Sequence, residues 1–479
     1  MRTFNNFIWR FAQTEGNYNF SSGSRGKGNL SSEANPYFLF PQIYNFRYNI
    51  FSSEWPVANR VIELYLQKKS ENGGWERQIN GISNNEKAVL LLEKRTFKEL
   101  LVDMELRNLQ NNIVGQEASR LFARAEINMG VEAFRDSLYS LLKRNTFLNI
   151  KFENMLDTLG EISRTDIRSL LGEWEKTTPL PFYSLGEPTL TKITNKGGEE
   201  FFVLKMLISN NSDYDGIIHM DIRKDGWWYQ PLEDPRAKTK IEMPAHTSKE
   251  FVSVWEDQIR NVEINTMVSG NLPNIISQDI NNVKQERNKI VKDSIYILPE
   301  SSFDLPGEII VDNEDSTLFI LSAPPIVGLL PKWLDEVEET PFKYSGISWW
   351  RPPLQWTATT NDRYYGKYIR SAFVIKSGDG SQTATWKVPV PEVGQYDLYY
   401  HVFKDDELRW NNNLQGEYHF KVKYGSEVED AYVNLRKANE GWEQLGSYYF
   451  DSDTVRVVLT DECKLRSVTA DAVKIVKRY

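Results

Sequence analysis

Cysteine and histidine are scarce in this chain of 479 residues, which has one cysteine, Cys463, and four histidines. One cysteine excludes a disulfide within the chain and a zinc site built on several cysteines. No histidine lies close to another in the sequence, and there is no His-Glu-x-x-His, the spacing that places two imidazoles on one helix face. We therefore expect no metal-binding residues in this chain.

Other catalytic motifs are missing as well. The sequence has no Gly-x-Ser-x-Gly elbow for a nucleophilic serine and no glycine-rich loop for phosphate. We can name no catalytic residue and no cofactor in this chain, and whether the protein is an enzyme stays open. Cys463 has no histidine near it in sequence, so we expect a structural or surface thiol.

Long apolar runs are absent too. None approaches the ~20 residues of a membrane-spanning helix, so we expect no transmembrane segment. The first residues, MRTFNNFIWRFAQTEG, lack the basic start and unbroken apolar stretch of a signal peptide. We expect either a cytosolic protein or a natural product that begins upstream of Met1, in which case a bacterial periplasm or the cell surface is the expected compartment, because scarce cysteine fits both.

A basic surplus is lacking, because the formal net charge is −9. A general nucleic-acid binder needs a basic face, so we expect no nucleic-acid partner. The hydrophobic content of 40% and the charged content of 26% are typical of globular proteins. A chain of this length divides into about three or four domains.

Hydrophobic periodicity divides the chain. Residues 1–53 form an irregular, aromatic-rich segment, and residues 54–183 have the 3.6-residue period of helices. We expect helices over 82–101, capped at Asn85, over 131–145, with Phe134, Leu138, Leu141 and Leu142 on one face, and over 163–176, starting at Ser163.

The period changes to two beyond these helices. Short alternating runs separated by turn residues predict one β-sandwich over 184–275 and another over 305–479. The polar, charged stretch between them, 276–304, indicates a connecting helix or linker. The predicted fold class is multidomain α+β, with an α-helical domain followed by two β-sandwich domains.

Aromatic side chains gather in the last part of the chain, where half of the 14 tryptophans lie after residue 330. Aromatic faces stack on sugar rings, although sandwich cores also use tryptophan and tyrosine. Adjacent strand residues point to opposite faces, so one member of Trp349-Trp350 and one of Tyr399-Tyr400 must face away from the core. The candidate binding residues are Trp349, Trp350, Tyr365, Trp410 and Trp442, of which Trp410 lies in a loop and is the best candidate for exposure.

Acidic residues offer weaker candidates. Asp312-Glu314-Asp315 and Asp405-Asp406-Glu407 have the oxygen ligands that Ca²⁺ prefers, but solvated turns are the favoured interpretation. Asp471 is flanked by apolar residues in SVTADAVKIV, so we expect its carboxylate to bind backbone or hydroxyl groups inside the sandwich.

Five spaced motifs in the last part of the chain carry a family resemblance. They are Asp312–Asp315 in GEIIVDNED, Gly378–Trp386 in KSGDGSQTATW, Gly394–Tyr399 in GQYDLY, Trp442–Phe450 in WEQLGSYYF, and Ala470–Val476 in ADAVKIV. In this order they resemble the golvesin C-terminal-like, or Xly carbohydrate-binding-like, domain over 305–479. This sequence lacks the family's early glycine after Asp315 and has an insert over 316–343. The resemblance implies an ancillary β-sandwich module that binds carbohydrate or cell-wall polymer, without catalytic residues.

A second resemblance covers 54–272. It is a resemblance to the helical part that follows the catalytic centre of aminopeptidase N-type zinc metallopeptidases. The marker residues of that part correspond here to Gly130, Phe134, Phe152, Ser163 and Trp174. In that family, too, a β-sandwich follows the helices. The zinc motif is absent, and Asn112 stands near the place of the family's tyrosine. The resemblance implies either a catalytic zinc domain upstream of Met1 or a degenerate, non-hydrolytic relative.

Three interpretations follow. The chain is a non-catalytic region of a peptidase-like protein whose C-terminal module binds a polysaccharide or peptidoglycan, which is the favoured hypothesis. Alternatively, it is the C-terminal part of an active zinc aminopeptidase, or its domains are structural spacers for protein interaction.

Overall fold

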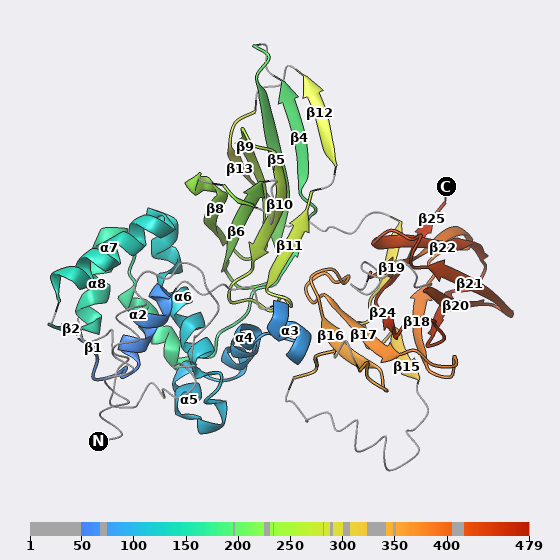
Figure 1. The fold of residues 1–479 in the computed structure, drawn as a ribbon, viewed down its shortest axis with the longest axis horizontal. Helices are drawn as coiled ribbons and strands as arrows, with labels where there is room; N and C mark the ends of the chain where they lie inside the picture. Colours follow the sequence, from blue (N-terminus) through green and yellow to red (C-terminus); the bar gives the residue numbers. More distant parts are fainter. Residues whose placement is uncertain are drawn as a thin grey trace.

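The computed structural model describes residues 49–67, 74–146, 148–194, 197–224, 230–232, 234–280, 282–287, 291–299, 307–322, 342–347, 351–404 and 416–478. Within these ranges the chain forms a helical part, at the left of Figure 1, a middle β-sandwich at the upper centre, and a C-terminal β-sandwich at the right. The expected fold class, multidomain α+β with two β-sandwiches, is confirmed.

The helical part packs around buried aromatic rings. The edge of the Trp174 ring meets Trp55 at 5.0 Å and Phe97 at 4.9 Å between centroids. Among the described residues, no helix is both long and apolar enough to cross a membrane. The elements are β1 (Asn49–Phe51), α2 (Ala58–Leu66), α3 (Gly74–Asn80), α4 (Asn84–Lys94), α5 (Phe97–Val102), η2 (Met104–Leu106), α6 (Gln110–Met129), α7 (Val131–Arg144), β2 (Asn149–Lys151), α8 (Phe152–Ser163) and η3 (Arg168–Glu175).

The helix predicted over 82–101 is two helices, α4 and α5. Ser83, not Asn85, caps α4: its side chain accepts from the Glu86 amide while the Glu86 carboxylate accepts from the Ser83 amide. Thr96 and Glu99 form the same capping box at α5. An N-cap residue has extended backbone, so the second box interrupts the helix that the apolar period alone predicted.

The helix predicted over 131–145 is α7, and Phe134, Leu138 and Leu142 are buried as expected, whereas Leu141 is only partly buried. The helix predicted to start at Ser163 is wrong. Ser163 is the last residue of α8, where its hydroxyl donates to the Leu159 carbonyl, and a 3₁₀ helix, η3, begins at Arg168.

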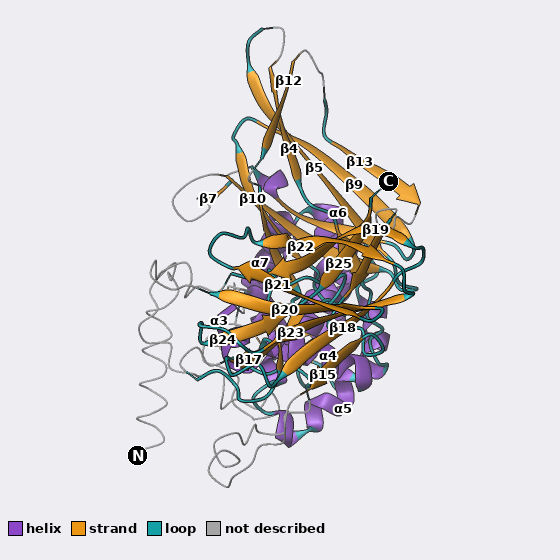
Figure 2. Cartoon of the chain, turned by 90° about the vertical axis from the view of Figure 1, so that its right-hand side faces the viewer, coloured by secondary structure: helices purple, strands orange, loops and turns teal. Residues whose placement is uncertain are grey.

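The middle sandwich has two sheets. One has the order β11-β10-β6-β7 with β8 also on β6, and the other has the order β12-β4-β5-β9-β13 with β3 also on β5. Figure 2 gives the view from the side of the C-terminal sandwich. The strands are β3 (Tyr183–Leu185), β4 (Thr189–Thr194), β5 (Glu200–Asn210), β6 (Gly216–Lys224), β7 (Gln230–Pro231), β8 (Lys238–Met243), β9 (Thr247–Trp255), β10 (Ile259–Asn265), β11 (Ile275–Asp279), β12 (Val283–Arg287) and β13 (Ser294–Pro299), with the 3₁₀ helix η4 (Pro235–Ala237).

The linker predicted over 276–304 is wrong for its described residues. β11 pairs with β10, β12 runs parallel to β4, and β13 pairs antiparallel with β9, so this stretch completes both sheets. The residues of β12, VKQER, are mostly polar, so their composition indicated a helix or linker. An edge strand needs little apolar surface, which is why composition misled the prediction.

The C-terminal sandwich has sheets of order β14-β25-β19-β22 and β15-β18-β23-β20-β21, and a third of order β16-β17-β24. Along β19, Tyr396, Leu398, Tyr400 and Val402 are buried in alternation, as the period of two predicts. The strands are β14 (Glu308–Val311), β15 (Phe319–Ser322), β16 (Thr357–Thr360), β17 (Ser371–Lys376), β18 (Thr383–Pro389), β19 (Gly394–Val402), β20 (Glu417–Tyr424), β21 (Glu427–Asn434), β22 (Gly441–Phe450), β23 (Thr454–Thr460), β24 (Ser467–Ala470) and β25 (Val473–Lys477).

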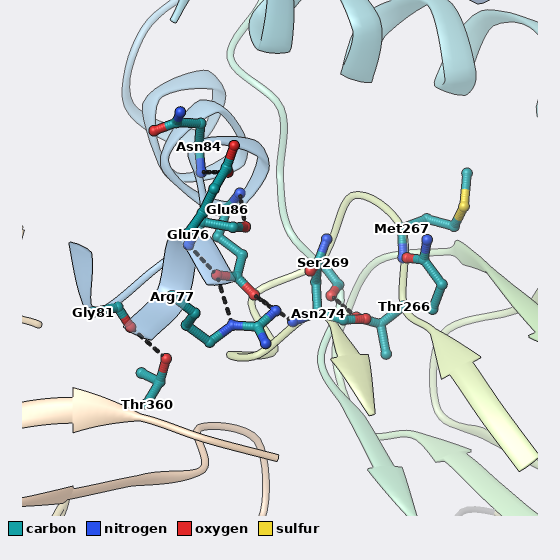
Figure 3. A network of polar contacts seen from close by, with 12 residues as sticks. Glu76, Arg77, Gly81, Asn84, Glu86, Thr266, Met267, Ser269, Asn274 and Thr360 are labelled. Carbon is teal, nitrogen blue, oxygen red and sulfur yellow. Dashed lines mark hydrogen bonds and ion pairs between the residues drawn. The ribbon is translucent and has the colours of Figure 1, made fainter. Parts of the chain in front are cut away.

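The three parts meet at a polar junction, seen closely in Figure 3. The buried Glu86 carboxylate accepts from Arg77 at 3.0 Å and from the backbone amide of Asn274 in the middle sandwich at 2.9 Å. Thr360 of the C-terminal sandwich donates to the Gly81 carbonyl at 2.6 Å. These bonds tie the α3–α4 turn to both sandwiches.

Apolar contact and strand pairing reinforce this junction. Leu272 of the middle sandwich exchanges backbone hydrogen bonds with the C-terminal sandwich, donating to Tyr368 at 3.1 Å and accepting from Arg370 at 2.6 Å. A Cβ on Gly346 would lie 1.8 Å from the Ile79 carbonyl oxygen, so only glycine allows the two backbones to approach this closely. The small core between the parts contains Ile82, Leu272, Tyr344 and Ala358.

Candidate functional site

Three aromatic rings gather on the outer side of the C-terminal sandwich. The centroid of Tyr365 lies 5.0 Å from Trp442 and 5.8 Å from His401, and His401 lies 5.2 Å from Trp442. Tyr365 and Trp442 are partly exposed, and the His401 side chain keeps 13% of its surface in solvent. We call these three residues the aromatic cluster.

Strand register brings two of the rings together. His401 on β19 stands directly opposite Trp442 on β22. Tyr400 is fully buried, so its neighbours Tyr399 and His401 face outward, which confirms the expectation that one member of Tyr399-Tyr400 faces away from the core. Tyr365 comes from the connection between β16 and β17, at 361–370.

Asp471, between β24 and β25, fixes the cluster from inside. Its carboxylate is fully buried and accepts from His401 Nδ1 at 2.9 Å and from the Tyr365 amide at 3.1 Å. Burial raises the pKa of Asp471, and the imidazole of His401 counteracts part of that rise. An ionised carboxylate accepts only, so Nδ1 donates to it and Nε2 is the remaining polar atom of the imidazole. The expectation that Asp471 binds backbone groups inside the sandwich is confirmed.

A cation borders the aromatic cluster. Lys474 Nζ lies 4.8 Å from the centroid of Trp442 and 5.3 Å from that of Tyr399. It also forms an ion pair with Glu308 at 3.1 Å, and its side chain keeps 12% of its surface in solvent. The surface therefore combines aromatic faces, an imidazole and an ammonium with its carboxylate partner, groups that together stack on a ring and hydrogen-bond to hydroxyls.

Two of the five sequence candidates, Tyr365 and Trp442, lie together in this cluster. Trp349, Trp350 and Trp410 lie outside the described residues. Sequence reasoning missed His401 and Lys474 as neighbours of the cluster. The sequence could have indicated His401, because it lies two residues after Tyr399 in β19 and therefore on the same face of the strand.

The other sequence candidates have structural partners. Glu314 accepts from Tyr344 at 3.0 Å and also binds Lys343 and Ser371, while Asp315 binds Thr317 in its own turn. Within the described part of the chain, no group of three or more potential metal ligands occurs. Asp405-Asp406-Glu407 lies outside that part.

Cys463 is partly buried, and burial raises the pKa of its thiol, which disfavours the reactive thiolate. The interpretation as a structural thiol fits this position.

Residues 352–477 match the model of the Golvesin C-terminal domain. The predicted resemblance is thereby confirmed for these residues, which contain four of the five motifs, whereas the Asp312–Asp315 motif lies before the matched range. A search of curated proteins finds no match. The match does not extend to the helical part, so the aminopeptidase resemblance of 54–272 stays a prediction.

Two solved structures share distant similarity with the chain. A Paenibacillus xanthan lyase is 16% identical over 63% of this chain and 26% of its own, with a TM-score of 0.26. A β-glucuronidase of Bacteroides uniformis is 10% identical over 74% of this chain and 39% of its own, with a TM-score of 0.20. The chain thus spans about a quarter and about two fifths of the proteins to which it is compared.

Proposed function

We propose that the C-terminal sandwich, as a golvesin C-terminal-like domain, binds a carbohydrate polymer through the aromatic cluster of Tyr365, His401 and Trp442. The observation that carries the proposal is the set of three rings within 5.8 Å of one another on the outer side of the sheet, two of which, Tyr365 and His401, belong to residues bonded to the buried Asp471 carboxylate. Partly exposed rings that are held from inside are preorganised for a ligand, which lowers the entropic cost of binding.

The chemistry of the cluster suits a sugar ring. The face of an indole or phenol ring is negative and attracts the C–H groups of a pyranose. His401 Nε2 and the Lys474–Glu308 pair lie beside the rings and supply hydrogen-bond donors and acceptors for hydroxyl groups. Trp349, Trp350 and Trp410 remain candidate binding residues on sequence grounds alone.

The rest of the chain acts, in this proposal, as a non-catalytic carrier of the module. The hydrogen bonds of Glu86 and Leu272 across the junction support a fixed position of the C-terminal sandwich relative to the rest of the chain. A peptidase-like origin of the carrier remains the sequence-based prediction.

The test is a pull-down of the full chain on insoluble peptidoglycan, chitin, xylan and cellulose. We expect Trp442→Ala or Tyr365→Ala to weaken retention on the preferred polymer by about tenfold, which corresponds to about 1.4 kcal/mol. The matched control is Tyr449→Ala, which removes an aromatic ring that is 59% exposed on the same strand. Trp410→Ala tests the sequence-based part of the surface.

Absence of retention on all four polymers, or equal loss with the control variant, would contradict the proposal. The alternative of a structural spacer would then be favoured.

A further inference from the structure

β13 exposes an unusual run of apolar side chains. Ile295, Tyr296, Ile297 and Leu298 are 55%, 51%, 72% and 38% exposed, although they are consecutive residues of one strand. Consecutive strand residues point to opposite faces, so both faces of β13 are apolar and open to solvent. Contiguous exposed apolar surface of this kind marks an interaction site in soluble proteins.

The outer edge of β13 is also open. β13 is the last strand of its sheet and pairs with β9 on one side, while none of the described strands pairs with its other side. Its outward-directed amides and carbonyls are a template for one more strand. This template and the apolar faces point to a partner that is itself an extended strand with apolar side chains.

The two edges of the same sheet differ in protection. β12, at the opposite edge, carries Lys284, Glu286 and Arg287 in five residues. β13 carries no charged residue between Ser294 and Pro299. Charged side chains on an edge strand prevent pairing with another sheet, and β13 lacks this protection.

The position of β13 explains its exposure. Ile295 stands opposite Phe251, which is 8% exposed in the core of the sandwich, whereas Ile295 itself is 55% exposed. The facing sheet therefore covers β9 and leaves β13 uncovered. Figure 2 shows β13 at the margin of the middle sandwich.

We propose that β13 pairs antiparallel with β13 of a second copy of this chain about a twofold axis. Pairing of identical edges closes after two copies, whereas pairing of β13 with the charged β12 of the next copy would continue without limit. The self-pair places the apolar side chains of Ile295–Leu298 opposite those of the second copy, and no charge is buried. A continuous sheet across both middle sandwiches results.

The interface is small. The exposed parts of the four side chains amount to roughly 400 Å² per copy, and edge-to-edge pairing covers only part of them, so the pair buries at most about 800 Å² in total, below the standard size for stable complexes. We therefore expect a reversible dimer with a dissociation constant in the micromolar range or weaker.

The test is sedimentation velocity of the full chain from about 1 µM to about 300 µM, a range chosen to span micromolar dissociation. We expect a monomer–dimer equilibrium that Ile297→Lys weakens by at least tenfold. The matched control is Gln285→Lys on β12, which adds the same charge at the opposite edge and should leave the equilibrium unchanged. Hydrogen exchange of the amides of Tyr296 and Ile297 should slow as concentration rises.

Three results would overturn the proposal. The first is a monomer at every concentration, which would mean that β13 does not pair with a second copy of this chain. The second is growth beyond dimers. The third is a dimer that Ile297→Lys leaves intact. Retention on polysaccharide does not depend on β13, so failure here leaves the proposed function standing.

Discussion

The two β-sandwiches of this chain have different interiors. The middle sandwich is filled mainly by aliphatic side chains and methionines, among them Met206, Ile218, Met220 and Ile264. The core of the C-terminal sandwich adds many aromatic rings to its aliphatic side chains, among them Trp386, Tyr396, Tyr400, Phe420 and Phe450. The second kind of core brings polar atoms inside, and buried polar atoms need partners.

Those partners connect the aromatic core to the proposed binding surface. Tyr400 donates its hydroxyl proton to the Thr469 carbonyl, and Tyr418 accepts from the Thr469 amide at 3.0 Å. Trp386 Nε1 donates to the Asp471 carbonyl at 3.2 Å. The short segment from Thr469 to Asp471 is therefore fixed by core aromatics, and Asp471 in turn fixes His401 and Tyr365. An aliphatic core fills space equally well but directs no such bonds.

The largest expected effect comes from breaking this connection at its centre. Trp386→Ala removes a fully buried ring that contacts Phe319 and Tyr400, and should destabilise the C-terminal sandwich by about 3–5 kcal/mol. Met220→Ala in the middle sandwich should cost about 2–5 kcal/mol and leave polysaccharide retention unchanged. Hydrogen exchange resolved by strand measures each sandwich separately, since several domains do not unfold as one unit. Retained binding in Trp386→Ala would contradict the connection.

A smaller effect is expected from Asp471→Ala. The change leaves the Tyr365 amide and His401 Nδ1 without their shared acceptor, which should cost about 1–3 kcal/mol. It should also weaken polysaccharide retention although Asp471 is buried away from any ligand. Nuclear magnetic resonance of the His401 ring reports its release directly. If retention were unaffected at unchanged stability, the anchoring role of Asp471 would be wrong.

The stability of the two sandwiches should depend differently on pH. In the C-terminal sandwich the titrating group is Asp312. Burial raises the pKa of Asp312 well above its usual value, and nearby Asp471 raises it further. The unfolded chain ionises first as pH rises, so the stability that Asp312 contributes is fully present below its ordinary pKa and is lost as pH rises through the raised value. Asp312→Asn keeps a neutral side chain at every pH, so we expect its unfolding midpoint to rise relative to that of the wild type as pH increases across this window. A difference that does not change with pH would contradict the shifted pKa.

The stability of the middle sandwich should depend on pH in the opposite direction, through His219. Burial, with Lys240 nearby, lowers the pKa of His219 from 6.5 to about 4. The unfolded chain binds the proton first as pH falls, so the stability present above pH 6.5 is lost between 6.5 and about 4. His219→Gln should flatten this loss in a thermal unfolding series, and an unchanged slope would assign the acid sensitivity elsewhere.

Local patterns predicted much of the two sandwiches. The alternation along 394–402 predicted that one of Tyr399 and Tyr400 faces outward, because a period of two is a property of the strand itself, but it did not say which one. Trp442 and Tyr365, two of the candidates named from the sequence, lie side by side in the structure, and their role in binding stays a prediction.

Long-range pairing was beyond the sequence. Asp471 and His401 are 70 residues apart and meet only through the register of β25 with β19. The strands of 276–299 were mistaken for a linker because an edge strand is stabilised by backbone pairing with β4 and β9, which leaves little trace in side-chain composition. The break between α4 and α5 was missed because a capping box competes with apolar periodicity, and the apolar pattern alone continues through it.

The connection at 361–370 has a mechanical consequence. It carries Tyr365 in its middle, and at its end Tyr368 and Arg370 are bonded to the backbone of Leu272 in the middle sandwich. A polymer strand that pulls on Tyr365 therefore loads the middle sandwich directly, through two backbone hydrogen bonds, as well as the sheet in which His401 and Trp442 lie. If the proposed function holds, tension on a bound polymer is shared between two domains, which opposes separation of the proposed binding surface from the middle sandwich.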